Sequence, residues 1–281
     1  MKLTDKFTDG RTLFAFELLP PLKGQNIESI YSAIDTLREF SPSYINVTYH
    51  REEIKLVERE GGLLERRVVR KRPGTVGISA AIQARYSIDV VPHLICGGFS
   101  ADETEDALIE MNFLGIDNVL ALRGDAPRGV SDWDWNAGHF HNARDLVRFL
   151  RSEHPDLGIG VAGYPAPHPD AATFASDRAY LADKLRAAGL ETPVIPGILP
   201  IQSFDSLRRV LSLCGANIPG KLYLELEAAH NEGGVEAVRE AGLRFAARQI
   251  RQLLDCGAPG IHLYSLNKSE MCLRLVEEAG L

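Results

Sequence analysis

The feature of this sequence that most restricts its fold is a repeated alternation of short apolar segments with longer amphipathic ones. The short segments are rich in Val, Ile, Leu and aromatic residues and are bounded by Gly, Pro or charged residues, a pattern typical of parallel strands covered on both faces. Seven strands are predicted, at residues 13–19, 44–49, 89–96, 118–122, 158–164, 194–199 and 260–266. Helices are predicted between them, at residues 27–40, 104–114, 143–153, 175–188, 204–214 and 234–256. The alternation indicates a parallel α/β fold.

The residues at the end of the first predicted strand distinguish between two possible parallel α/β folds, a Rossmann-type sheet and a βα barrel. A Rossmann-type sheet opens with a Gly-rich phosphate turn, but this strand runs into Pro20-Pro21, and no GxGxxG motif occurs. Polar residues recur instead at the C-terminal ends of the predicted strands: Glu17, Thr48, His93, Arg123, Asp125, Tyr164 and Asn267. In a βα barrel these ends converge on the face that carries the active site. We therefore predict one TIM-type βα-barrel domain over residues 1–281.

The number of predicted strands is one short of a closed barrel, which has eight. Leu222–Leu226 alternates like a strand, but it lies in a helix-rich region and is not counted. We expect a barrel that lacks one strand in this sequence.

Charge and hydropathy exclude several classes of protein. The formal net charge is −7 without a sustained basic block, which makes nucleic acid a poor partner. The Arg-rich stretch Glu65–Arg72 is interpreted as a solvated helix face before a loop. No apolar run approaches the roughly 20 residues that cross a bilayer, and the first residues lack the apolar core of a signal peptide. A cytoplasmic protein without membrane contact is expected.

The four cysteines, Cys96, Cys214, Cys256 and Cys272, are widely separated. They form no CxxC motif and no Cys/His pair at metal-ligand spacing. We expect reduced, mostly buried thiols and no metal site.

Glu17 is a lone carboxylate in an apolar strand, just before the rigid Pro20-Pro21 turn. Burial of a carboxyl group without a partner is costly and raises its pKa. A raised pKa is what a general acid needs near neutral pH. A Glu paired with an Arg at the mouth of the barrel is an equally open interpretation.

Arg123, Gly124 and Asp125 end another predicted strand in close succession. Glycine lets the backbone approach a flat or phosphorylated ligand, Arg can pair with a pyrophosphate, and Asp can accept hydrogen bonds from a heterocycle. A structural turn with an Arg–Asp ion pair is the alternative. The position at a strand end favours a functional role.

Two further groups of residues are weaker candidates. His93, Tyr164 and His168 are not spaced for a metal, so we interpret them as ligand-packing or hydrogen-bonding groups. Asp177 and Lys184 lie seven residues apart on one face of a predicted helix, where a solvated ion-pair face is the alternative.

A series of motifs runs in order through nearly the whole chain. It comprises Phe16–Pro21, Val47–Tyr49, Pro92–Leu94, Ala121–Asp125, Tyr164–Pro169, Pro196–Pro200 and Tyr264–Asn267. The series resembles that of the methylenetetrahydrofolate reductases, and the chain is similar to their short bacterial single-domain form.

The resemblance implies an FAD-dependent oxidoreductase. In this family NADH or NADPH reduces FAD, and the flavin then reduces 5,10-methylenetetrahydrofolate to 5-methyltetrahydrofolate for methionine synthesis, in a ping-pong scheme. Glu17 would be the general acid, and Asp125 would contact the pterin and bias the flavin. The implied FAD contacts are Thr48, Tyr49, His93, Leu122, Arg123, Gly124, Asp125, Ala143, Tyr164, His168, Ala171, Asp177 and Lys184. The implied substrate contacts are Glu17, Asp125, Tyr264 and Lys268. Bacterial relatives also imply a homo-oligomer.

Two departures from the family pattern matter. After Lys184-Leu185 the chain runs straight into Arg186, where the family has a strand with a Gln–Phe segment that contacts folate and nicotinamide. About one βα unit, on the order of 30 residues, is missing there, either from the recorded sequence or from the protein. Lys268 stands where the family often has Arg, which keeps the charge but loses bidentate geometry.

Two other functions stay open. Another FAD barrel, such as a proline dehydrogenase, is disfavoured by the Glu-x-x-Pro-Pro of the first strand. A degenerate FAD-binding homologue that acts as a non-catalytic assembly partner is kept open by the missing strand.

Overall fold

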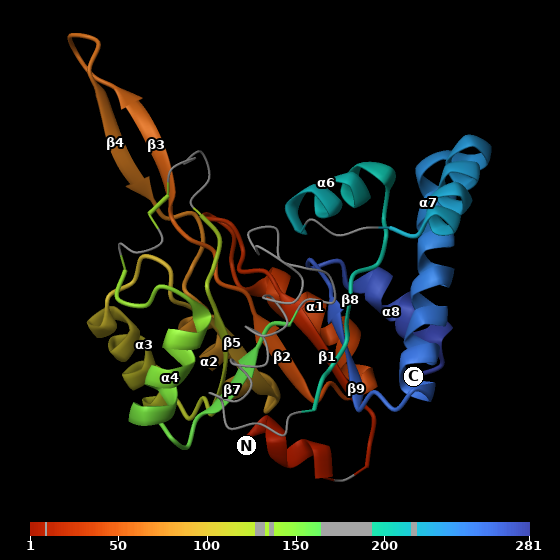
Figure 1. Cartoon of the computed structure of the whole chain (residues 1–281), viewed down its shortest axis with the longest axis horizontal. Coiled ribbons are helices and arrows are strands. Elements are labelled where there is room, and N and C mark those ends of the chain that lie inside the picture. Colours follow the sequence, from red (N-terminus) through yellow and green to blue (C-terminus); the bar gives the residue numbers. More distant parts are fainter. Residues whose placement is uncertain (9, 127–132, 135–137, 164–192, 215–217) are drawn as a thin grey trace. The chain divides into compact units, whose positions relative to one another are not determined.

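The computed structural model describes residues 1–8, 10–126, 133–134, 138–163, 193–214 and 218–281 (Figure 1). The chain forms two compact units that interleave along the sequence. Unit 1 contains residues 1–5, 18–32 and 44–162, and unit 2 contains residues 6–17, 33–43 and 163–281. Each unit is described by itself, and the single domain over residues 1–281 stays a prediction.

The sheet of unit 1 has parallel strands in the order β7-β6-β5-β2. These strands are β2 (Tyr44–Val47), β5 (Asp89–Ile95), β6 (Asn118–Leu122) and β7 (Gly158–Val161). Neighbouring strands are in register, so that His93 of β5 lies opposite Leu120 of β6. Their apolar residues are buried on both faces, as expected for parallel strands covered by helices.

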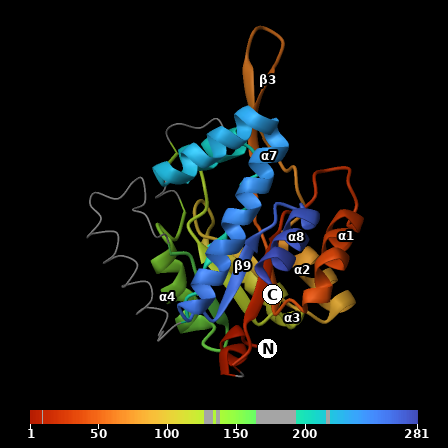
Figure 2. The same ribbon diagram turned by 90° about the vertical axis from the view of Figure 1, so that its right-hand side faces the viewer.

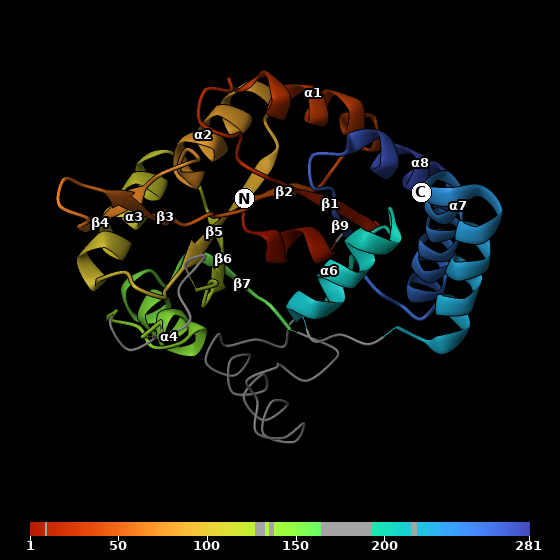
Figure 3. The ribbon, with the colours of Figure 1, turned by 90° about the horizontal axis from the view of Figure 1, so that it is seen from above.

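Three helices of unit 1 lie outside its strands when seen from above (Figure 3). They are α2 (Thr75–Tyr86), α3 (Ala101–Phe113) and α4 (Ala143–Glu153). A capping box starts α3, because the Ser100 hydroxyl accepts a hydrogen bond from the Glu103 N–H at 3.1 Å and the Glu103 carboxylate accepts one from the Ser100 N–H at 2.8 Å. This capping box fixes where α3 begins after the end of β5.

A separate antiparallel hairpin, β3 (Glu53–Glu58) and β4 (Leu64–Val69), extends from the rest of unit 1 (Figures 1 and 2). The helix face expected for Glu65–Arg72 is therefore wrong. Leu64–Val69 pairs residue by residue with Glu53–Glu58 in an antiparallel ladder, and Gly61 and Gly62 both have positive φ, which allows a tight turn.

The sheet of unit 2 has parallel strands in the order β1-β9-β8, with Glu17 opposite Tyr264. They are β1 (Leu13–Leu18), β9 (Gly260–Tyr264) and β8 (Gly197–Ile198). Its helices are α6 (Phe204–Cys214), α7 (Gly220–Asp255) and α8 (Ser269–Ala279), of which α7 and α8 pack against each other (Figure 2). Leu222–Leu226 is helical, in agreement with its exclusion from the predicted strands.

The remaining described elements are α1 (Glu28–Leu37) and two 3-10 helices, Leu3–Thr8 and Arg38–Phe40. The described residues thus contain seven parallel strands at the seven predicted places, one fewer than a closed barrel has. The predicted class, a parallel βα fold of the barrel type lacking one strand, is confirmed. The helix predicted at 175–188 lies outside the described residues.

Within the described ranges, no helix is long and apolar enough to cross a membrane. The same ranges contain no group of three or more His, Cys, Asp or Glu residues arranged to hold a metal ion. Cys96, Cys256 and Cys272 are free thiols, and burial raises the pKa of Cys96 to about 11 and that of Cys272 to about 12. The buried thiols of Cys96 and Cys272 are therefore protonated and unreactive near neutral pH.

Candidate functional site

The end of β2 fixes the chain next to Glu17. The Thr48 N–H donates to the Leu18 carbonyl at 3.0 Å, and the Thr48 hydroxyl donates to the same carbonyl at 3.2 Å. The Thr48 oxygen also lies 3.1 Å from Nε2 of His50. Thr48 is buried, so its hydroxyl positions the residue that directly follows Glu17.

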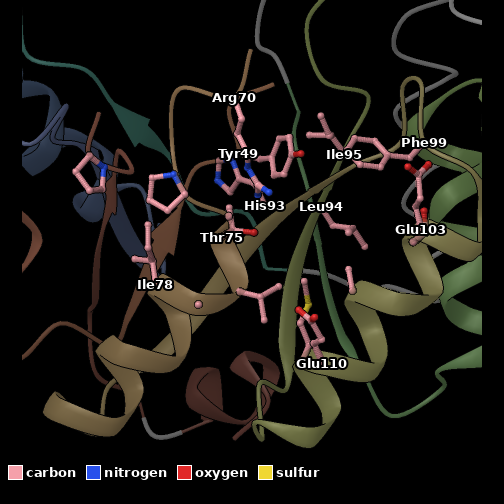
Figure 4. A pocket seen from close by; sticks show the side chains of 18 of the residues that line it. Tyr49, Arg70, Thr75, Ile78, His93, Leu94, Ile95, Phe99, Glu103 and Glu110 are labelled. Atoms are coloured by element: carbon pink, nitrogen blue, oxygen red, sulfur yellow. The ribbon is translucent and has the colours of Figure 1, made fainter. Parts of the chain in front are cut away.

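A cavity of about 460 Å³ in unit 1 is lined by Tyr49 and His93 (Figure 4). Phe99 lines it too and meets the Tyr49 ring edge-to-face, with 5.7 Å between ring centroids. Burial raises the pKa of Tyr49. The wall is mostly apolar and aromatic, which suits a flat organic ligand.

His93 is a polar group of this cavity whose pKa is strongly lowered by its surroundings. Burial, and secondly the nearby His50, lower the pKa of His93 to about 4, so its ring is neutral at pH 7. Its Nε2 atom is buried and has no hydrogen-bond partner in the part of the chain that the structure describes. Because an unpaired buried polar atom is costly, this nitrogen is available to a ligand.

The loop after β6 is tied to the loop after β5. The Gly97 N–H donates to the Arg123 carbonyl at 3.0 Å. Gly124 has φ +82°, and a Cβ atom there would lie 3.1 Å from the Ile95 side chain. The positive φ and the close contact together favour glycine at this position. Arg123 is half-buried, whereas Asp125 is exposed.

Ala143 is buried in the first turn of α4. The Asn142 side chain caps this helix by accepting a hydrogen bond from the Asp145 N–H at 3.1 Å. Leu122 ends β6, and its carbonyl accepts from the Cys96 N–H at 3.0 Å. The structure thus brings the predicted cofactor residues of unit 1 to strand ends or to the start of the following helix.

Arg51 is a residue of this region that the sequence analysis missed. Its Nε and Nη2 atoms are buried and have no hydrogen-bond partner among the described residues. Its guanidinium lies over the Trp133 ring, 5.1 Å from the centroid, and burial lowers its pKa. A buried guanidinium with unused donors suits an anionic ligand. Its place three residues after Thr48 could have revealed it.

Glu17 is the most unusual carboxylate of unit 2. It is 8% exposed, and burial raises its pKa to about 7. Its carboxylate has no hydrogen bond or ion pair with any described residue. The alternative of a Glu–Arg pair therefore has no support in the described part of the chain.

The turn after β9 is tied to β1 next to Glu17. The Ser265 hydroxyl donates to the Glu17 carbonyl oxygen, and the Asn267 N–H donates to the Ser265 oxygen at 3.2 Å. Leu266 and Asn267 both have positive φ, +49° and +59°. Such strain costs of order 1 kcal/mol for each residue and clusters at functional sites.

Tyr264 and Lys268 lie at this same turn. Tyr264 is 37% exposed, and a Cβ atom at Gly197 would lie 2.5 Å from its hydroxyl oxygen. Gly197 therefore leaves the space that the tyrosine ring occupies. The Lys268 ammonium donates to Oε1 of the buried Gln202. Sequence analysis missed Gln202, although it closely follows β8.

Five predicted cofactor residues lie outside the described residues, namely Tyr164, His168, Ala171, Asp177 and Lys184. The junction at Leu185-Arg186 lies there too.

The family model described as methylenetetrahydrofolate reductase matches residues 2–189 and 181–280, which is nearly the whole chain. The chain belongs to the methylenetetrahydrofolate reductase family. The family resemblance expected from the motif series is confirmed. The two matched segments overlap at 181–189, around the Leu185-Arg186 junction where a family segment is predicted to be missing.

Curated relatives in this family carry matching names. "Methylenetetrahydrofolate reductase (NADH) 1" of Arabidopsis thaliana is 29% identical over 320 residues, covering 100% of this chain and 51% of the relative. "Methylenetetrahydrofolate reductase 1" of Schizosaccharomyces pombe is 30% identical over 314 residues, covering 100% of this chain and 49% of the relative. "5,10-methylenetetrahydrofolate reductase" of Salmonella typhimurium is 26% identical over 296 residues, covering 96% of this chain and 92% of the relative.

The chain spans about half the length of the plant and yeast relatives but 92% of the Salmonella one. The plant and yeast alignments run over 320 and 314 residues, whereas this chain has 281. Those relatives therefore contain residues that this chain lacks.

Proposed function

We propose that this chain is an FAD-dependent 5,10-methylenetetrahydrofolate reductase that uses NADH or NADPH as its electron donor. The observation that carries the proposal is Glu17, a buried carboxylate without a partner among the described residues and with a pKa near 7, on the first strand of a member of this family. Such a group can hold a proton at neutral pH and give it to a substrate.

The described residues include groups that suit FAD. Of the proposed contacts, Tyr49 and His93 line the cavity, and the His93 Nε2 atom is buried without a hydrogen-bond partner among the described residues. The Arg51 guanidinium is not part of that lining, but two of its nitrogens have no hydrogen-bond partner in the described part of the chain. The proposed FAD-binding residues of the described part are Thr48, Tyr49, His93, Leu122, Arg123, Gly124, Asp125 and Ala143. When bound, FAD supplies the hydride transfer between the two substrates. Arg51 and Arg123 offer the cations that its pyrophosphate requires.

His93 orients the ligand without adding charge. Its ring is neutral at pH 7 because its pKa is lowered to about 4, so it contributes a hydrogen bond and ring contact only. Tyr49 and Phe99 give the same cavity an aromatic wall against which a flat ring can pack.

Glu17 provides the acid of the folate step. Proton donation to a ring nitrogen of 5,10-methylenetetrahydrofolate opens the five-membered ring to a cation that accepts hydride. Glu17 can donate near pH 7, because burial keeps a large fraction of its carboxyl groups protonated. The hydrogen bonds of Thr48 to the Leu18 carbonyl and of Ser265 to the Glu17 carbonyl fix the backbone on both sides of the acid.

Asp125, Tyr264 and Lys268 are the proposed contacts of the folate. Asp125 is exposed, so its carboxylate is free to accept hydrogen bonds from the pterin. Tyr264 offers an aromatic ring, and Lys268, held by Gln202, offers a positive charge to the carboxylates of the folate tail. The ping-pong order, the cytoplasmic location and the homo-oligomeric state stay predictions.

The test uses the two half-reactions separately. The purified protein should be yellow, NADH or NADPH should bleach it, and methylenetetrahydrofolate should restore the colour. Glu17→Gln should leave flavin reduction within about twofold and slow reoxidation by the folate at least about a hundredfold, because only that step needs a proton donor.

Glu28→Gln is the matched control, because Glu28 is exposed on α1, and it should change neither half-reaction. A colourless protein would favour the degenerate homologue and reject the proposal. Equal slowing of both half-reactions by Glu17→Gln would show that Glu17 has a structural role instead.

A further inference from the structure

The sheet of unit 2 has two faces of different character. Side chains alternate between the faces along each strand, and residues paired in a parallel register point to the same side. One face carries only buried apolar side chains within the strands, namely Phe14, Phe16, Ile261, Leu263 and Ile198. This face is therefore part of the hydrophobic core.

The opposite face, here called the acid face, carries Glu17. It includes Ala15 and Glu17 of β1, His262 and Tyr264 of β9, and Gly197 of β8. The titratable groups on this face of the three strands are Glu17, His262 and Tyr264. The proposed reaction uses Glu17 and Tyr264 but gives the histidine no role.

His262 lies inside the protein. It is 7% exposed, and both nitrogens of its ring are buried. Its backbone N–H donates to the Pro196 carbonyl at 2.9 Å, which ties β9 to the start of β8. The rings of His262 and Tyr264 meet edge-to-face, with 5.3 Å between their centroids. The imidazole therefore lies beside the tyrosine that we assign to the folate.

Small residues flank His262 on both neighbouring strands. Its partner on β8 is Gly197, and its partner on β1 is Ala15. The Tyr264 ring occupies the space above Gly197, because a Cβ atom there would lie 2.5 Å from the tyrosine hydroxyl oxygen. On the other side, Ala15 has only a methyl group. That position on the acid face is thus left to the larger side chains next to it, those of His262 and Glu17.

Glu17 and His262 are diagonal neighbours on this face. Glu17 pairs with Tyr264, which follows His262 by two residues. Strands about 4.8 Å apart, with a rise of about 3.3 Å per residue, put the Cα atoms of such neighbours about 8 Å apart. Long and aromatic side chains can meet across such a diagonal. Because the Glu17 carboxylate makes no hydrogen bond to a described residue, they meet after a side-chain rotation or through one water.

The proposed function, on which this inference rests, consumes a proton at Glu17 in every turnover. The O–H bond of the acid breaks when a ring nitrogen of the folate is protonated, and a carboxylate is left behind. Glu17 must take up a new proton before the next folate can react. Its burial limits direct contact with bulk water. Histidine is the side chain that most readily takes up and releases a proton near neutral pH.

We propose that His262 returns the proton to Glu17 after each folate has reacted. The N–H bond of the imidazolium breaks and the O–H bond of the Glu17 carboxyl group forms, directly or through one water. The neutral imidazole then takes a proton from water or from a buffer acid. His262 acts through Glu17 and not on the folate, so it is a positioning residue.

A comparison of single and multiple turnovers tests this role. His262→Gln keeps a hydrogen-bonding side chain and His262→Phe keeps a ring beside Tyr264, but neither can carry the proton. When prereduced enzyme reacts once with methylenetetrahydrofolate, both variants should stay within about twofold of the wild type, because Glu17 starts protonated. In steady state kcat should fall about tenfold, because reprotonation of Glu17 becomes the slow step. Added imidazole should restore most of the lost rate, since it supplies the missing proton carrier.

His230→Gln is the matched control, because His230 is an exposed histidine on α7 of the same unit, and it should change neither rate. Circular dichroism shows that each variant is folded. If single and multiple turnovers slow together and imidazole has no effect, His262 has only a structural role and the proposal is overturned. A wild-type kcat in both His262 variants would also overturn it, because water would then protonate Glu17 directly.

The wild-type protein allows a second test that needs neither a His262 variant nor folate. In protein labelled with carbon-13 at the glutamate carboxyl carbons and the histidine rings, the Glu17 signal should show an inflection at the pH where the His262 ring titrates. A new charge on the neighbouring strand causes this inflection. A Glu17 signal that does not respond to His262 would overturn the proposal, even if the enzyme reduces folate. A wild-type protein that reduces no folate would instead overturn the proposed function, whatever the two signals show.

Discussion

Two carboxylates at strand ends, Glu17 of β1 and Asp125 after β6, have the same chemistry in opposite surroundings. Glu17 is 8% exposed and its pKa rises to about 7, whereas Asp125 is exposed in a glycine-containing loop. Both are candidates because they lie at the C-terminal ends of strands, but their different burial separates their roles. Enzymes with two carboxylates divide acid and charge-stabilising work by this difference of environment.

The comparison also shows how each carboxylate is held. Glu17 belongs to a strand whose backbone is fixed on both sides, by Thr48 at Leu18 and by Ser265 at its own carbonyl. Asp125 follows Gly124, where φ is +82° and a Cβ atom would lie 3.1 Å from the Ile95 side chain, so that glycine is favoured there. The backbone of Glu17 is thus held in place by a sheet, and that of Asp125 by a close-packed turn.

The largest expected effect on stability concerns Glu17. It tests whether burial makes the free energy of unfolding depend on pH at Glu17 but not at Asp125. Its folded-state pKa lies above its usual value of 4.5, so ionisation destabilises the folded protein as the pH rises from about 4.5 through 7. The free energy of unfolding of the wild type should fall by about 3 kcal/mol relative to Glu17→Gln over that range. Urea titrations at about pH 5 and about pH 8 measure this difference. Asp125→Asn should change the unfolding free energy by less than about 0.5 kcal/mol at either pH, and a constant offset for Glu17→Gln would contradict the assignment.

A second substitution disturbs the strand that supports Glu17 and leaves the Asp125 loop alone. Gly197→Ala places a methyl group 2.5 Å from the Tyr264 hydroxyl oxygen, so it should destabilise the protein by about 1–3 kcal/mol and raise the KM for folate. Gly220→Ala at the exposed start of α7 is the control, because nothing lies within 4 Å of that site, and it should be neutral or stabilising by up to about 1 kcal/mol. Equal effects of the two substitutions would contradict the proposed contact between Tyr264 and the folate.

The smallest effect is expected at the exposed carboxylate. Asp125→Asn should slow reoxidation of the flavin by folate about tenfold, which corresponds to about 1.4 kcal/mol, because the amide keeps the size but loses the charge. Reduction of the flavin by NADH should change less. Stopped-flow absorbance of both half-reactions measures the ratio, and an unchanged folate half-reaction would reject the contact with the pterin.

The strands and the environment of Glu17 were predictable from the sequence because they depend on local patterns. Seven apolar runs gave seven strands, and a single Glu within Leu13–Leu18 could only be buried. Helix α2 was missed because its buried face includes Thr75 and Ser79, which break the apolar periodicity of Ile78 and Ile82.

Features that depend on distant partners could not be predicted. The helix face predicted for Glu65–Arg72 is wrong because this Arg-rich run has no strand periodicity of its own, and only pairing with β3 makes Leu64–Val69 a strand. The roles of Arg51 and Gln202 depend on Trp133 and Lys268, which lie 82 and 66 residues away along the sequence. No local pattern contains that information.

The most direct test of the account is the titration of Glu17 itself. Carbon-13 NMR of protein labelled at the glutamate carboxyl carbon, compared with the same spectra of Glu17→Gln, isolates the signal of this one residue. The account predicts that the signal titrates near pH 7. A midpoint near the usual value of 4.5 would mean that Glu17 is ionised at neutral pH and cannot be the proton donor.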